Sequence, residues 1–317
     1  MKTLTFTNGD TLPAIGLGTW KSAPGEVYDA VLHAIKSGYR HIDCAAIYMN
    51  EKEVGKALRK ALEDSLVKRE DLWVTSKLWN NAHKRADIKP AIRKTLSDLQ
   101  LDYLDLYLVH WPVAMKPDVV FPDGPDDFLP LDEVPLSETW SGMEDIHAEG
   151  LARHIGVSNF NIDKLDEVMA KARVQPEMNQ VEMHPYLPQQ KLVDYCHRHD
   201  IHLTAYSPLG SGDRASRMKR ENEPVLFDDQ TIKDIAEQHD CSPAQVLISW
   251  AVHRGTAVIP KSTNPGRIEQ NLASADIQLT EGDMEAIKQI GQDFRYIDGS
   301  LWAMEGSPYE LSDLWTE

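Results

Sequence analysis

The feature that most constrains the fold of this chain is a regular alternation between short apolar runs and longer segments of helical periodicity. The apolar runs, which we expect to be strands, are Ile15–Thr19, His41–Ala45, Leu72–Leu78, Leu104–His110, His154–Asn159, Met178–Met183, His202–Ser207 and Ala257–Ser262. The expected helices are Glu26–Ser37, Glu51–Glu63, Ile88–Leu99, Glu138–Glu149, Ile162–Ala172 and Gln190–His199, and a longer insert carries two further helices before the last strand. Strands that alternate with helices in this way predict an α/β fold with a parallel sheet.

Eight such strands form either an open doubly wound sheet or a closed (β/α)8 barrel, and three features favour the barrel. The number of strands is the number that a barrel requires. Gly16-Leu17-Gly18 is not followed by the third glycine of a dinucleotide-binding turn. Polar residues lie at the carboxyl ends of different strands, where a barrel builds its site. We therefore expect one (β/α)8 TIM-barrel domain over residues 1–317.

Turn and capping signals add local detail to this expectation. Asn8-Gly9-Asp10 lies between two short runs that alternate polar and apolar residues, which predicts an N-terminal β-hairpin over residues 3–13. Asn161, Asp228 and Ser242 each stand just ahead of a helical pattern, so we expect them to be helix N-caps.

Two long connections and an apolar tail are expected at the rim of the barrel. Val113–Leu136 and Leu209–Val225 exceed ordinary loop lengths, and loops of that length are more often functional lids than passive connectors. The C-terminal tail, residues 291–317, is too apolar for a solvated terminus, and we expect it to fold over the active-site rim. For Tyr309 and Trp315, packing against the flank of the barrel is an equal alternative.

The charge balance limits the partners of this chain. Thirty-three Lys and Arg against 50 Asp and Glu give a net charge of −17, which argues against nucleic acid or an anionic membrane because both need a basic face. No apolar run approaches the ~20 residues of a membrane span. Cys44, Cys196 and Cys241 form no CxxC pair, and the amino terminus lacks a signal-peptide run. We expect a soluble cytoplasmic protein with a small-molecule partner.

Four side chains of complementary chemistry are expected to meet at the rim. Asp43, Lys77 and His110 lie at the ends of the second, third and fourth expected strands, and Tyr48 follows the second. A tyrosine with its ordinary pKa near ~10 is a poor acid at neutral pH. A nearby ammonium lowers that pKa, a carboxylate holds the ammonium in place, and histidine orients the substrate. The set suits protonation of a carbonyl oxygen.

Two other kinds of active site find little support in the sequence. Gly156-Val157-Ser158-Asn159-Phe160 begins like the nucleophile elbow of a serine hydrolase but lacks its final glycine. There is no HExxH motif, and His197 and His199 stand two residues apart, a spacing that points them to different sides of a helix. We therefore expect no metal site.

Three longer motifs occur in order along the chain. They are Gly38-Tyr39-Arg40-His41-Ile42-Asp43-Cys44-Ala45 through Asn50-Glu51-Lys52-Glu53-Val54-Gly55, then Gly156-Val157-Ser158-Asn159-Phe160, then Ile259-Pro260-Lys261-Ser262. Together they resemble signatures of the aldo-keto reductase superfamily, over essentially the whole chain and nearest to the aldehyde and aldose reductase branch. The resemblance implies a (β/α)8 barrel with NAD(P)H across the carboxyl-end rim and a reducible carbonyl in a pocket above it.

By motif match, the resemblance implies that Tyr48 is the general acid, that Lys77 and Asp43 lower its pKa, and that His110 orients the substrate. It also implies hydrogen bonds to the nicotinamide carboxamide from Ser158, Asn159 and Gln180, with Tyr206 stacked on the nicotinamide ring. The implied pyrophosphate contacts are Thr19, Trp20, Lys21, Ser207, Leu209 and Ser211. In the same loop, Asp213 resembles a clasp that pairs with Lys21 and Lys261.

The preferred cofactor follows from the last of these motifs. The positions that match a site for the adenosine 2′-phosphate are Lys261, Ser262, Thr263 and Arg267, and Gln270 and Asn271 complete the implied cofactor contacts. Two cations and two hydroxyls near a helix start form a dianion site, which favours NADPH. Gln270 stands where many NADP-specific relatives carry Glu, so NADH is the less favoured alternative.

Aromatic and apolar residues just beyond the strand ends indicate a substrate pocket, because the core of a barrel has stopped there. The expected substrate contacts are Trp20, Ile47, Trp79, Trp111, Phe121 and Leu301.

These observations lead to the hypothesis of an NADPH-dependent oxidoreductase that reduces aldehydes, and with them aldoses and some ketones, to alcohols. In reverse, at high pH, it would act as an alcohol dehydrogenase. The alternative is a cofactor-binding regulatory or sensor protein on the same barrel, which has no evident need for the acid Tyr48. A metal-dependent barrel hydrolase, which would bind zinc, is the third interpretation. Family habit indicates a monomer.

Overall fold

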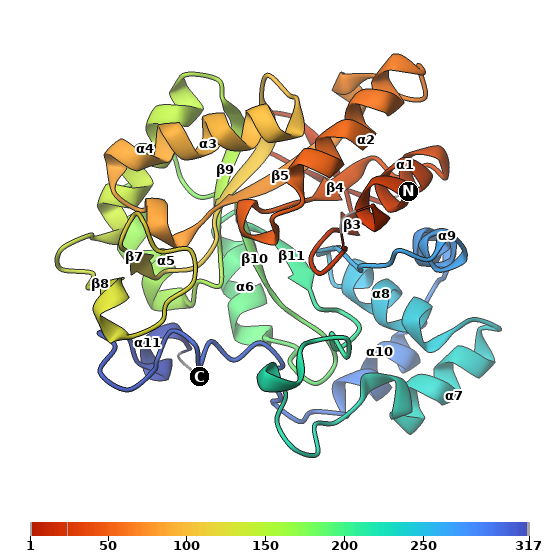
Figure 1. Ribbon diagram of the computed structural model, residues 1–317. Helices are drawn as coiled ribbons and strands as arrows, with labels where there is room; N and C mark the ends of the chain where they lie inside the picture. Colours follow the sequence, from red (N-terminus) through yellow and green to blue (C-terminus); the bar gives the residue numbers. More distant parts are fainter. Residues whose placement is uncertain (1, 24, 316–317) are drawn as a thin grey trace.

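Eight parallel strands form the centre of the computed structural model, which describes residues 2–23 and 25–315 (Figure 1). The strands, in their order across the sheet, are β3 (Leu17–Gly18), β4 (His41–Asp43), β5 (Trp73–Leu78), β6 (Leu104–Val109), β9 (Ala152–Ser158), β10 (Met178–Glu182), β11 (His202–Tyr206) and β12 (Ala257–Val258). Among these eight strands, those that pair in the sheet also follow one another along the chain. Because they are parallel, each connection must cross back through the outer layer.

The last strand returns to the first and closes the barrel. Ile15 forms a parallel bridge with Val258, and Gly18 forms another with Lys261. The Gly16 amide donates to the Val258 carbonyl at 2.9 Å, and the Val258 amide donates to the Ala14 carbonyl at 2.7 Å. The predicted (β/α)8 barrel is therefore confirmed, with its polar backbone groups paired across the seam.

The helices lie outside the strands, as Figure 1 shows. They are α1 (Glu26–Lys36), α2 (Glu51–Glu63), α3 (Arg85–Leu99), α4 (Leu136–Ala148), α5 (Ile162–Met169), α6 (Gln190–Arg198), α7 (Gln230–Gln238), α8 (Pro243–His253), α9 (Pro265–Ala273), α10 (Glu281–Lys288) and α11 (Leu311–Leu314). Short 3-10 helices are η1 (Ala46–Tyr48), η2 (Arg69–Asp71), η3 (Asn80–Ala82), η4 (Pro125–Asp127), η5 (Ser216–Met218), η6 (Leu226–Asp228) and η7 (Ser274–Asp276). The two helices expected before the last strand are α7 and α8. No helix in the described part of the chain is long and apolar enough to cross a bilayer.

Two of the three predicted N-caps are confirmed. The side chains of Asn161 and Ser242 accept backbone amide hydrogen bonds in the first turns of α5 and α8. The prediction for Asp228 is wrong, because Asp229 caps α7 with its carboxylate on the first-turn amides. Asp228 is still the last residue of η6, and extended backbone suited to an N-cap begins only at Asp229.

The predicted N-terminal hairpin is present and seals one end of the barrel. It pairs β1 (Thr3–Thr5) with β2 (Thr11–Pro13) across a turn in which Gly9 has φ 89°. Phe6 of this hairpin stacks on Trp73, the first residue of β5, with ring centroids 5.0 Å apart. The hairpin thus covers the amino ends of the strands and leaves the carboxyl ends for a site.

The tail and the first long loop pack together at the carboxyl end. The loop Val113–Leu136 contains a short antiparallel ribbon of β7 (Ala114–Met115) and β8 (Phe128–Leu129), which Figure 1 shows close to α11. The Tyr309 hydroxyl donates to the Leu129 carbonyl at 2.6 Å and accepts from the Ala114 amide at 2.9 Å. The tail therefore lies over the rim, as predicted.

An apolar cluster joins this tail to residues that follow strands β5 and β6. Its buried members are Trp79, Trp111, Val113, Met115, Phe128, Trp302, Tyr309 and Leu314, and Ile47, Ile297 and Trp315 pack against it. Trp315 lies 5.9 Å from Trp111 between ring centroids. Tyr309 and Trp315 thus pack at the rim rather than on the barrel flank.

Candidate active site

A buried ion pair lies at the carboxyl ends of two neighbouring strands. Asp43 is the last residue of β4, and Lys77 lies near the end of β5. Their side chains are 1% and 0% exposed, and Lys77 Nζ lies 2.6 Å from Asp43 Oδ1. Lys77 Nζ also donates to the Cys44 carbonyl at 2.8 Å. A buried pair is tolerable only when such additional hydrogen bonds satisfy its charges.

Asp43 is fixed by residues from other strands of the barrel. Gln180 on β10 donates through Nε2 to Asp43 Oδ2 at 2.8 Å. Thr19 donates through its hydroxyl to the Asp43 carbonyl at 2.8 Å. Both carboxylate oxygens of Asp43 therefore have donors, which holds Lys77 at one place.

Tyr48 ends η1 directly above this pair. Lys77 Nζ donates to Tyr48 Oη at 3.3 Å and lies 5.1 Å from the ring centroid. Burial raises the pKa of Tyr48 to about 12, and the ammonium of Lys77 offsets only part of this effect. Lys77 lowers this pKa, as expected, but the cost of removing water from the phenolate is larger, so the pKa of Tyr48 stays above its ordinary value.

The surroundings of Lys77 also determine its own charge. Burial lowers the pKa of Lys77, but the charges and hydrogen bonds of Asp43 and Tyr48 together outweigh this effect and raise the pKa to about 12. At neutral pH, Tyr48 is therefore a neutral phenol that carries its proton beside a charged ammonium. This arrangement suits a proton donor, because the cation stabilises the phenolate that forms when the proton leaves.

His110 follows β6 and faces Tyr48. The two rings are 6.0 Å apart between centroids, and Trp79 lies 5.2 Å from the His110 ring. Burial, and secondly the charge of Lys77, hold the pKa of His110 well below its ordinary range. Its Nδ1 is buried and has no hydrogen-bond partner among the described residues. His110 is therefore a neutral imidazole.

A second polar network connects the ends of β6, β9, β10 and β11. Asn159, with φ 63°, donates to the His110 carbonyl at 2.9 Å and accepts from the Tyr206 hydroxyl at 2.7 Å. Ser158 donates to the Gln180 carbonyl at 2.7 Å. Asparagine tolerates the left-handed backbone better than most residues, which explains its use at this turn. The four residues predicted to contact a nicotinamide therefore lie together.

Charged residues gather beside the first and last strands. Asp213 pairs directly with Lys21, and Lys261 Nζ lies 3.4 Å from Asp213 Oδ2. Lys21 also donates to the Ser211 hydroxyl at 2.8 Å, and its Nζ lies 4.3 Å from the Trp20 ring centroid. The loop that contains Asp213 is thus tied to both strands that form the barrel seam.

The residues predicted to contact the adenosine phosphate, together with Gln270 and Asn271, lie just before α9 or on it. Ser262 and Asn271 are buried, Thr263 is partly exposed, and Arg267 and Gln270 are exposed. Asn264 caps this helix, with Oδ1 accepting from the Arg267 amide at 3.0 Å. Sequence reasoning missed Asn264, although Asn before Pro at a helix start is a recognised N-cap signal.

Aromatic side chains gather near Tyr48 and His110. Trp302 lies 5.7 Å from Trp79 and 5.6 Å from Trp111 between ring centroids. Phe121, 52% exposed, and Leu301, 47% exposed, present apolar surface to solvent. Trp302 was not among the predicted contacts, and its only sequence signal was the apolar character of the tail. Asn50 was also missed: its side-chain amide donates to the Thr19 carbonyl at 2.9 Å.

The remaining predicted residues lie on the same rim. Ser207 has φ 47°, Leu209 is partly buried and packs against the main core, and the Trp20 ring centroid is 6.5 Å from that of Tyr48. In residues 2–23 and 25–315, no group of three or more His, Cys, Asp or Glu side chains could hold a metal ion.

Comparisons with known proteins indicate one family for the whole chain. Residues 14–292 match the aldo/keto reductase family. The chain is 52% identical over 317 residues to an aldo/keto reductase of Synechocystis sp., covering 100% of this chain and 97% of that protein. It is 49% identical over 303 residues to aldo-keto reductase family 1 member A1 of Gallus gallus, covering 95% and 92% of the two chains. A solved structure, aldose reductase from Schistosoma japonicum, matches with a TM-score of 0.87 and 39% identity, covering 98% of this chain and 99% of the other.

Proposed function

This chain belongs to the aldo/keto reductase family, and we propose on that premise that it is an NADPH-dependent enzyme that reduces aldehydes to alcohols. Family membership makes it an oxidoreductase that acts on small carbonyl compounds with a nicotinamide cofactor. The observation that carries the finer proposal is the contact of 3.3 Å between Lys77 Nζ and Tyr48 Oη, with Asp43 behind the lysine.

The donor set of the rim fits a phosphorylated nicotinamide cofactor. Lys21 and Lys261 share one carboxylate, Asp213, so this side of the rim has an excess of positive charge that a pyrophosphate would balance. The start of α9 adds backbone amides and the exposed guanidinium of Arg267, which favour a 2′-phosphate. This charge supports NADPH over NADH, even though Gln270 is uncharged.

When bound, NADPH supplies the hydride for the carbonyl carbon. Tyr48 donates its hydroxyl proton to the carbonyl oxygen, and Lys77 stabilises the resulting phenolate because its charge lies within hydrogen-bond distance. Asp43 keeps that ammonium in position. His110, a neutral imidazole with one N–H, orients the carbonyl oxygen. For the reverse reaction Tyr48 must lose a proton of pKa about 12, so alcohol oxidation is favoured at high pH.

The walls of the pocket support aldehydes with an apolar or aromatic body. Trp79, Trp111 and Trp302 supply flat apolar surface, and Phe121 and Leu301 lie at its outer edge. Aldoses and some ketones fall within the same proposal. We further expect the enzyme to act as a monomer in the cytoplasm.

The decisive experiment compares the wild type with Tyr48→Phe, using oxidation of NADPH in the presence of an aromatic aldehyde. We expect the variant to lose turnover by about 10²–10⁴-fold, the usual contribution of a positioned acid, and to bind NADPH as before. Unchanged turnover would reject Tyr48 as the proton donor. NADPH binding by the wild type without turnover of any aldehyde, sugar or ketone in a panel would favour the sensor protein instead.

Cofactor preference has its own test. Arg267→Met should weaken NADPH binding by about tenfold and leave NADH binding unchanged, because only NADPH carries the 2′-phosphate. Equal effects on the two cofactors, measured by fluorescence titration, would contradict this assignment.

A further inference from the structure

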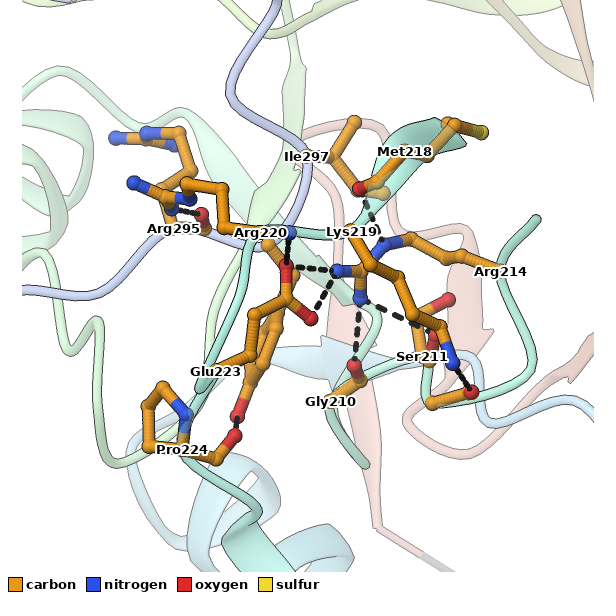
Figure 2. A network of polar contacts seen from close by, with 12 residues as sticks. Gly210, Ser211, Arg214, Met218, Lys219, Arg220, Glu223, Pro224, Arg295 and Ile297 are labelled. Atoms are coloured by element: carbon orange, nitrogen blue, oxygen red, sulfur yellow. Dashed lines mark hydrogen bonds and ion pairs between the residues drawn. The ribbon is translucent and has the colours of Figure 1, made fainter. Parts of the chain in front are cut away.

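The loop Leu209–Val225 contains a buried arginine that the proposed reaction does not use. The side chain of Arg214 is 0% exposed, although most of the loop around it faces solvent. Charged side chains are seldom fully buried unless they are paired. The contacts of Arg214, drawn in Figure 2, therefore indicate what this side chain does.

Arg214 holds three parts of its own loop together. Its Nη1 donates to the carbonyls of Gly210 and Ser211 at 3.1 and 3.2 Å, and its Nε donates to the Met218 carbonyl at 3.3 Å. Its Nη2 lies 2.6 Å from each carboxylate oxygen of Glu223. Figure 2 shows the guanidinium at the centre of these contacts. The beginning, middle and end of the loop are thus joined through one side chain.

On one side, this loop carries the group that pairs with the phosphate-side lysines. Asp213 precedes Arg214 and pairs with Lys21 and Lys261. Ser211, whose carbonyl accepts from Arg214, also accepts from Lys21 through its hydroxyl at 2.8 Å. The position of this charged cluster therefore depends on the backbone that Arg214 holds.

On its other side, the loop packs against the tail. The Tyr296 hydroxyl donates to the Pro224 carbonyl at 2.8 Å, and the Arg214 guanidinium carbon lies 5.2 Å from the Tyr296 ring centroid. A Cβ on Gly210, which has φ 81°, would lie 3.3 Å from the end of the Tyr296 ring. Arg220 of the loop donates to the Arg295 carbonyl. Loop and tail are therefore in close contact at several points.

The same tail segment reaches the aromatic pocket. Glu182, the last residue of β10 and 0% exposed, accepts the backbone amides of Tyr296 and Ile297 at 2.6 and 2.7 Å. Ile297 packs against the cluster that contains Trp302. A continuous set of contacts thus runs from Asp213 through Arg214 and Tyr296 to the wall of the pocket.

We propose that Arg214, through Glu223, is a positioning residue that couples the cofactor side of the rim to the substrate pocket. The closed loop and the tail segment Phe294–Ile297 are stabilised as one unit. Loosening the Arg214–Glu223 pair therefore speeds cofactor dissociation and weakens substrate binding together. This inference rests on the proposed function, because it takes the cluster around Asp213 as the cofactor side.

The first test uses the protein without cofactor, so that it does not depend on the proposed reaction. Hydrogen exchange is measured by mass spectrometry for the wild type, Glu223→Gln and Arg214→Met. The matched control is Arg85→Met, which removes a two-bond pair with Asp145 on the outside of the barrel. We expect exchange about tenfold faster in both 210–223 and 294–297 for the Glu223 variant, and no change there for the control. Faster exchange in the loop alone overturns the coupling.

The second test measures function. Glu223→Gln should raise the NADPH dissociation rate in stopped-flow fluorescence by about tenfold and raise the KM of an aldehyde severalfold, with kcat nearly unchanged. A loss of folded protein would instead lower kcat and leave KM unchanged. Tyr296→Phe removes only the hydroxyl contact with Pro224 and should raise KM with a smaller effect on NADPH dissociation.

The outcomes separate the two proposals. Absence of NADPH binding by the wild type refutes the proposed function, and the exchange measurement still decides the coupling. NADPH binding with a faster dissociation rate but an unchanged KM in Glu223→Gln refutes the coupling and leaves the proposed function standing.

Discussion

Glu51 offers a direct test of how burial controls charge beside the site. This first residue of α2 is 4% exposed, and its carboxylate accepts hydrogen bonds from Ser76 at 2.5 Å and Thr95 at 3.1 Å. Burial raises the pKa of Glu51 from its ordinary value of 4.5 to about 7, which the two hydroxyls only partly offset. The folded protein therefore binds a proton more tightly than the unfolded chain does.

The sign of the pH dependence follows from linkage. Between pH 4.5 and about 7 the folded state holds more protons at Glu51 than the unfolded state, so stability falls as pH rises through this range. One pKa unit corresponds to ~1.4 kcal/mol, so the shift costs roughly 3 kcal/mol of unfolding free energy above pH 7, most of it lost between pH 5 and pH 8.

Glu51→Gln removes the titrating group and keeps an amide oxygen for one hydroxyl. The free energy of unfolding is measured by urea titration with tryptophan fluorescence. We expect the difference between Glu51→Gln and the wild type to change by roughly 2–3 kcal/mol in favour of the variant from pH 5 to pH 8. Glu63→Gln, at the exposed end of the same helix, is the matched control and should follow the wild type. Parallel curves for the wild type and Glu51→Gln would refute the reasoning.

Three further predictions concern packing and charge elsewhere. Burial lowers the pKa of His154, but hydrogen bonds and charges of Glu177 and Asp10 on either side of the ring raise it above its ordinary value. The stabilisation of the fold by these contacts is therefore complete below pH 6.5 and is lost at higher pH. In urea titrations, the loss of stability in His154→Gln relative to the wild type should shrink as pH rises. Gly55→Ala should cost about 3 kcal/mol or more in the same assay, because the new Cβ would meet the rigid backbone at the end of α3, whereas Gly282→Ala in α10 should be nearly neutral. Trp302→Ala should raise the KM of aromatic aldehydes by about tenfold with little change in kcat, since it removes ring contacts in the pocket wall; an unchanged KM would contradict that placement.

The barrel could be predicted because its signal is local and repeated. Each strand and helix carries its own periodicity, and eight repeats restrict the topology to few choices. The four residues Asp43, Tyr48, Lys77 and His110 could be brought together from sequence because they lie at, or just after, the carboxyl ends of three consecutive strands. Consecutive strands of a barrel are neighbours in space, so their ends form one part of the rim. The error at Asp228 has a local cause, since two successive aspartates compete for one cap and only backbone geometry decides between them.

Other features depend on contacts that no local pattern encodes. Glu182 binds the amides of Tyr296 and Ile297, which are far away in the chain. In the sequence, Arg214 is one more charged residue in a polar loop, but in the structure its side chain is buried. The sequence shows the charge next to Tyr48 but not the cost of removing water from its phenolate, so the raised pKa of Tyr48 could not be predicted from it.

The seam of the barrel has a consequence for synthesis of the protein. Residues near Ile15 can pair with Val258 only after Val258 itself has left the ribosome. Until then, a nascent chain presents two open sheet edges, at β3 and at β11, with unsatisfied backbone groups that invite aggregation. Chains cut short before β12 should therefore be insoluble rather than partly active, because no shorter ring of strands can close.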